Sequence, residues 1–63
     1  MEKTIKAIYM TRYTVELVEA SSGDYVVVYY NGSTQGVNYS EAIKDYNMAS
    51  YLFDLKVDEL SGH

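Results

Sequence analysis

The sequence contains no cysteine and no proline, and its only histidine is His63, the last of 63 residues. Without cysteine there are no disulfide bonds, and a zinc site lacks the thiolate and imidazole ligands that it usually needs. A histidine at the end of a chain has no fixed surroundings to hold it in a catalytic geometry, so a Ser-His-Asp relay is not expected. We expect no metal, no cofactor and no catalytic residues.

Long apolar runs and an excess of basic residues are also missing. No stretch approaches the ~20 apolar residues of a membrane span, and the first residues contain no apolar run of signal-peptide length. Five Lys and Arg against nine Asp and Glu give a net charge of −4, which would repel a phosphate backbone. Residues 31–36 lack the lysine and the strand-to-helix setting of a phosphate-binding loop. The sequence favours a soluble, unprocessed cytoplasmic protein without membrane contact or direct nucleic-acid binding.

The length allows one domain, spanning residues 1–63. A chain of this size buries only about 60% of the surface that its unfolded form exposes. Domains this small usually gain stability from disulfides, a metal or a partner subunit. Because neither disulfides nor a metal are expected here, a partner subunit is the remaining source of added stability.

Apolar and polar residues alternate from Ile5 to Leu17, which predicts a half-buried strand over residues 5–19. Fifteen residues exceed the usual strand of about 3–10, so a bend is expected near Thr11 and Arg12. Residues 25–30 are all β-branched or aromatic and predict the central strand. Asn31-Gly32 is typical of a tight turn and leads to an expected edge strand over residues 33–37. Together these three segments predict an antiparallel meander of three strands.

The C-terminal third predicts one long helix over residues 41–60, with Asn38 or Ser40 as N-cap and Gly62 closing its end. Spacings of three and four residues place one apolar set on the side that faces the sheet. The members of this core set are Ala42, Tyr46, Ala49, Phe53, Val57 and Leu60. The expected fold class is α+β, with a three-stranded antiparallel meander followed by one long helix packed on one face (β-β-β-α).

The same helix carries a second apolar set on its other side, which we name the helix ridge. Its members are Met48, Tyr51, Leu52 and Leu55. Contiguous exposed apolar surface tends to mark an interface, and most soluble oligomers are symmetric homodimers. The ridge therefore predicts a protein partner, with a second copy favoured. Two alternatives remain open: residues 1–10 fold back over the ridge, or the residues are tolerated as scattered exposed side chains.

Eight tyrosines are a further unusual feature, because tyrosine is enriched at recognition surfaces. Tyr25 and Tyr29 share a strand face with Val27, whereas Tyr30 points the other way with Val26. At least one tyrosine must therefore lie off the core. Stacking of single-stranded bases on such a face would need a basic surround, which the composition does not supply.

Acidic residues along the predicted helix suggest an alternative function. Glu41, Asp45 and Glu59 lie on one flank, and Asp54 and Asp58 are paired on the other. Spaced carboxylates can imitate nucleic-acid phosphates, as in small phage-type inhibitors that block nucleic-acid-binding proteins; solvated surface charge is the plainer interpretation. A small apolar ligand between helix and sheet is a third possibility, limited by the small volume available. The main prediction is a non-catalytic, self-associating protein-interaction or regulatory domain.

Overall fold

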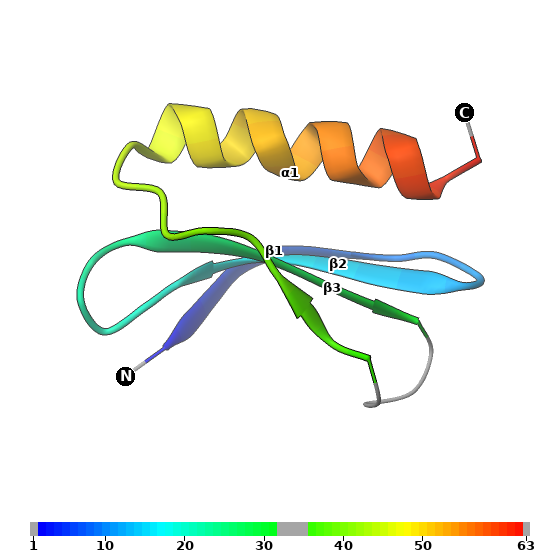
Figure 1. Cartoon of the computed structure of the whole chain (residues 1–63), viewed down its shortest axis with the longest axis horizontal. Coiled ribbons are helices and arrows are strands. Elements are labelled where there is room, and N and C mark those ends of the chain that lie inside the picture. The colour runs from blue at the N-terminus through cyan, green and yellow to red at the C-terminus, as the bar shows by residue number, and fades with distance from the viewer. Residues whose placement is uncertain (1, 32–35, 63) are drawn as a thin grey trace.

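The computed structural model describes residues 2–31 and 36–62. Within them, four antiparallel strands form one sheet, and a C-terminal helix covers one face of it (Figure 1). The elements are β1 (Lys3–Tyr9), β2 (Tyr13–Glu19), β3 (Tyr25–Asn31), β4 (Asn38–Tyr39) and α1 (Tyr46–Leu60). The strands lie side by side in sequence order. The predicted α+β meander with one helix is confirmed, and the sheet contains a fourth strand.

The predicted single strand over residues 5–19 is wrong, because this segment forms the β1–β2 hairpin. The chain reverses at Thr11 and Arg12, where only a bend within one strand was expected, and Met10 N donates a hydrogen bond to the Tyr13 carbonyl at 2.7 Å. Common two-residue turns require positive φ. No described non-glycine residue has a positive φ, so this turn closes without left-handed backbone. An irregularity between Thr4 and Lys6 shifts the register of β1 against β2, as a β-bulge does.

The last strand is short and lies further along the chain than predicted. β4 pairs with β3 through Val28 opposite Tyr39 and Tyr29 opposite Asn38. Most of the predicted 31–37 turn and strand falls on residues 32–35, which lie outside the described residues, while residues 36–37 are not in a strand. The edge position predicted for this part of the chain is confirmed for β4.

The helix begins at Tyr46, so the predicted start at residue 41 and the predicted caps Asn38 and Ser40 are wrong. Residues 40–43 are held to β3 instead: Ser40 N donates to the Val27 carbonyl at 2.9 Å, and Tyr25 and Ile43 exchange two main-chain hydrogen bonds. Asp45 is the N-cap, and its carboxylate accepts from Met48 N at 2.8 Å. The predicted end is confirmed, since α1 stops at Leu60 and Gly62 has φ +97°.

The core lies between α1 and the central strands β2 and β3. Five buried side chains form it, and they are Val15, Leu17, Val27, Ala49 and Phe53. Of the predicted core set, Ala49 and Phe53 are buried, while Val57 and Leu60 are half-buried against them. Tyr46 is 41% exposed, with its ring edge-on to Tyr25 at 5.5 Å. Ala42 precedes the helix and is exposed. Phe53 is the largest fully buried side chain, and its burial contributes roughly 1.5–3 kcal/mol.

Among the described residues, no helix is both long and apolar enough to cross a membrane.

Candidate functional site

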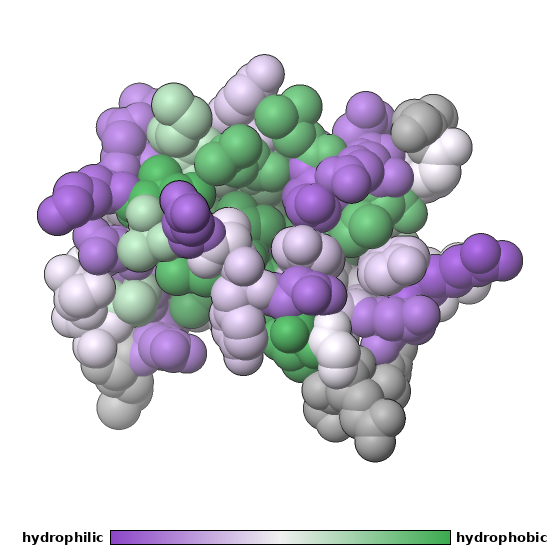
Figure 2. Space-filling view, viewed as in Figure 1, coloured by the Kyte–Doolittle hydropathy of each residue, from purple (hydrophilic) through white to green (hydrophobic). Residues whose placement is uncertain are grey.

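Three members of the helix ridge project from the side of α1 that faces away from the sheet. Met48 is 52% exposed, Tyr51 59% and Leu55 46%. Figure 2 shows hydrophobic surface reaching from the seam between helix and sheet onto the outer side of the helix, with hydrophilic side chains at both ends. β1 lies within the sheet, on the opposite side of the core, so the described residues of the N-terminal segment do not cover the ridge.

The fourth member, Leu52, lies on the flank of the helix and is half-buried against the core. It borders a groove of about 230 Å³ between α1 and the β3–β4 edge. The groove is lined by Val27, Tyr29, Ser40, Leu52, Leu55, Lys56 and Glu59. Small-molecule pockets usually measure about 300–1,000 Å³, so this groove suits an inserted side chain better than a bound ligand.

Lys56 and Glu59 form an ion pair of 2.9 Å at the mouth of this groove. The Lys56 ammonium also lies 4.5 Å from the centroid of the Tyr29 ring. The hydrogen bond to Glu59 raises the pKa of Lys56 above its ordinary value, although desolvation opposes the shift. Lys56 is therefore held as a cation over an aromatic ring, and the groove has a charged rim and an apolar floor.

The candidate acidic residues do not share one environment. Asp45 is engaged as the helix N-cap and Glu59 is paired with Lys56. Glu41 lies in the exposed segment before the helix, apart from the other carboxylates of α1. Asp54 and Asp58 are exposed one turn apart on α1. The sequence placed all five on one helix. In the structure three of them lie on α1, and Glu59 is paired with Lys56, whereas no ion pair is found for Asp54 and Asp58 among the described residues.

The sheet has a second exposed surface, which we name the open face: the side of the sheet away from α1. Its larger apolar and aromatic members are Tyr9, Val18, Val26, Val28, Tyr30 and Tyr39. Thr4, Ala7, Thr14 and Glu16 complete it. Tyr9 on β1 is 76% exposed and Tyr39 on β4 is 68% exposed, whereas Val18 on β2 is only 9% exposed. Such an aromatic, nearly uncharged surface has the composition of a protein interface.

Among the described strand residues of this face, Glu16 is the only charged one, and neutral donors satisfy both of its carboxylate oxygens. Thr4 Oγ1 donates to one at 3.2 Å, and Tyr30 Oη donates to the other at 2.8 Å. The hydrogen bond to Glu16 raises the pKa of Tyr30 above its ordinary value of 10.0, with burial and the negative charge adding to the effect. The hydrogen bond ties the Tyr30 side chain to β2. Among the described residues, no buried side-chain nitrogen or oxygen atom lacks a hydrogen-bond partner.

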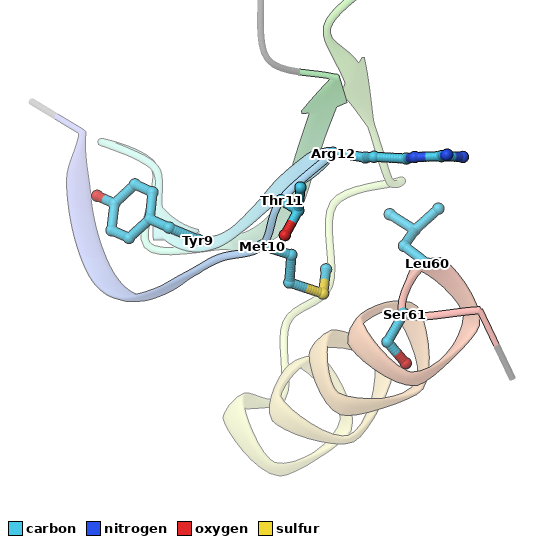
Figure 3. A pocket seen from close by; sticks show the side chains of 6 residues that line it. All are labelled: Tyr9, Met10, Thr11, Arg12, Leu60 and Ser61. Atoms are coloured by element: carbon cyan, nitrogen blue, oxygen red, sulfur yellow. The ribbon is translucent and has the colours of Figure 1, made fainter.

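Sequence reasoning found part of the open face, because it placed Tyr30 with Val26 away from the core. It missed Tyr9, which a single strand over residues 5–19 would put on the core side. Figure 3 shows Tyr9 pointing away from Met10 and the helix, on the other side of the β1–β2 hairpin. The reversal at Thr11 and Arg12 is what moves Tyr9 to the open face.

A shallow hollow of about 460 Å³ lies between the hairpin and the end of α1 (Figure 3). Its lining residues are Tyr9, Met10, Thr11, Arg12, Leu60 and Ser61. Arg12 is the only charged residue among them, and no lining residue provides a carboxylate or an imidazole to act as a general base. The hollow is therefore an open depression beside the hairpin, and its lining residues do not form a catalytic site.

In the described part of the chain, no three His, Cys, Asp or Glu residues lie together as a metal-binding group. Comparison of the chain with protein-family models, with curated proteins and with solved structures finds no match. The helix ridge and the open face are the two exposed surfaces with the composition of an interface.

Proposed function

We propose that this chain is a small, non-catalytic protein-interaction domain that self-associates through its helix ridge. The observation that carries the proposal is the exposure of Met48, Tyr51 and Leu55 on the outer side of α1, at about half of each side chain or more. In a domain of 63 residues, that outer side normally carries polar residues. We place the domain in the cytoplasm, in keeping with its cysteine-free sequence.

Burial of the ridge favours association. Full burial of an exposed apolar side chain contributes roughly 1.5–3 kcal/mol, and covering these half-exposed side chains contributes about half of that each, before the costs of bringing two molecules together. The residues lie at i, i+3 and i+7 along α1, so they form one stripe that a partner surface can cover without distortion of the helix. Leu52 supports this stripe from the flank through its contact with the core.

Measurement of solution mass tests the proposal. Wild-type protein should exceed the monomer mass of 7.2 kDa by light scattering, and the excess should grow with concentration. Tyr51→Asp combined with Leu55→Asp should return the mass to that of one chain. Leu52 is not used in this test, because a carboxylate there would enter the core and unfold the domain.

A matched control adds the same charge elsewhere. Thr11→Asp combined with Ser21→Asp places two carboxylates on exposed turns that belong to neither surface, and it should associate like wild type. Far-UV circular dichroism of all three proteins establishes that the fold is kept. Wild-type protein that stays monomeric up to high micromolar concentration would contradict self-association.

A further inference from the structure

The two apolar surfaces of this domain lie on opposite sides of the molecule. The helix ridge is on the outer side of α1, and the open face is on the far side of the sheet on which α1 packs (Figure 1). Within the chain, α1 covers only one side of the sheet. A second helix of the same kind would cover the other.

The two surfaces have complementary shapes. In Figure 1 the N-terminal half of β1 and the short β4 both curve away from the helix, so the open face is concave in this view. Its most exposed side chains, Tyr9 and Tyr39, stand on the two edge strands. In the middle, Val28 is small, and the Tyr30 side chain is tied to Glu16 on β2 by a hydrogen bond. Side chains that are tall at the edges and short in the centre form a trough, and a helix is a convex cylinder of about 10 Å diameter.

The charges favour the same pairing. α1 carries three carboxylates and one lysine, so ridge-to-ridge pairing of two copies brings two acidic helices together. Like charges held close together repel each other and oppose association. The strand residues described on the open face include one charged group, Glu16, whose oxygens already accept hydrogen bonds from Thr4 and Tyr30. A second copy's helix therefore meets far less repulsion on the open face than on another helix.

We propose that the open face of one copy is the receptor for the helix ridge of the next. Met48, Tyr51 and Leu55 of one chain would lie over Val26, Val28 and Tyr30 of its neighbour, between the neighbour's exposed tyrosines. The contact joins two different surfaces, so each added copy leaves one ridge and one open face uncovered, and the assembly can grow as a stack. This inference rests on the proposed self-association and specifies which surface receives the ridge.

Two monomeric variants that complement each other provide the test. The ridge variant is Tyr51→Asp with Leu55→Asp, which leaves the open face intact. The face variant is Tyr9→Glu with Tyr39→Glu, which changes only two highly exposed side chains and leaves the ridge intact. Each variant alone should have the mass of one chain. An equimolar mixture should form a complex of one ridge variant with one face variant and stop at two chains, whereas wild type continues to grow with concentration.

The other outcomes show whether this inference fails alone or together with the proposed function. A face variant that associates like wild type, beside a monomeric ridge variant, overturns the inference and leaves ridge-to-ridge association standing. A ridge variant that associates while the face variant does not overturns both. Two monomeric variants whose mixture is also monomeric overturn the inference, and monomeric wild type overturns both. If either variant loses its circular dichroism signal, Met48→Asp replaces Leu55→Asp and Tyr39→Glu alone replaces the face pair.

Discussion

The phenol of Tyr30 on β3 donates a hydrogen bond of 2.8 Å to the carboxylate of Glu16 on β2. This bond crosses the middle of the open face, where Thr4 supplies the second donor to the same carboxylate. A charged group that already has its partners can be covered by another molecule at much lower cost than one whose partners are water alone. The pair therefore makes the centre of the open face compatible with binding an apolar surface.

Titration of Tyr30 tests this pair. The difference in tyrosinate absorbance between wild type and Tyr30→Phe should show a group that titrates above the ordinary pKa of 10.0, and Glu16→Gln should bring that pKa back down. Because the raised pKa favours the protonated phenol in the folded state, the stabilisation is fully present below pH 10 and is lost as the pH rises through the raised value. A Tyr30 that titrates at or below 10 would show that the hydrogen bond is absent in solution.

Alanine substitutions on opposite sides of α1 should have very different costs. Phe53→Ala removes the largest buried side chain of the helix and should lower the free energy of unfolding by about 3–5 kcal/mol, enough to unfold a domain this small. Leu55→Ala, at 46% exposure, is the matched control and should cost less than about 1 kcal/mol in the monomer. Urea denaturation at low protein concentration measures both values. Similar losses for the two variants would contradict the division of the helix into a core side and a ridge.

The start of the helix can be tested at its cap. Asp45→Ala removes the carboxylate that accepts from Met48 N and should destabilise the fold by about 0.5–2 kcal/mol. Glu41→Ala lies where the sequence predicted the first helical turn, but here it precedes the helix and should change stability by less than about 0.5 kcal/mol. Thermal denaturation compares the two variants. A larger loss for Glu41→Ala would place the helix start upstream of Tyr46.

Salt dependence distinguishes an apolar contact from one made by carboxylates. Association through the helix ridge should hold or tighten when sodium chloride rises from about 50 to 500 mM, because screening reduces repulsion between acidic copies. Asp54→Lys combined with Asp58→Lys should leave that association in place. A partner whose affinity falls steeply with salt and with this charge reversal would instead support the acidic-inhibitor alternative.

The core side of α1 could be predicted from sequence because burial follows the helical period directly: Ala49 and Phe53 recur at a spacing of four and are both buried. The helix start could not be predicted in the same way. Ser40 suits an N-cap by its side chain, but its hydroxyl accepts from Val27 N and donates to the Glu41 carbonyl, which ties this segment to β3. Whether Ser40 caps a helix or binds a strand depends on its contact with Val27, 13 residues away in the sequence. A pattern of neighbouring residues does not reveal such a contact.

The open face was only partly predictable for a related reason. Alternation along residues 5–19 continues with the same parity through Thr11 and Arg12, so it gives no sign that the chain reverses there. In the hairpin, Tyr9 pairs with Thr14 and Ile8 with Val15, so between the bulge and the turn the odd residues of β1 share a face with even residues of β2. A reversal therefore exchanges the two faces of the first strand, and Tyr9 moves from the expected core to the surface.

The bulge between Thr4 and Lys6 has a consequence at the boundary of the sheet. It breaks the regular run of main-chain groups on the edge strand β1, while the opposite edge, β4, is only two residues long. An incoming strand finds too short a template on either edge to extend the sheet sideways. Although this chain has two apolar faces, its sheet edges therefore disfavour the edge-to-edge, amyloid-like growth that long exposed strands permit.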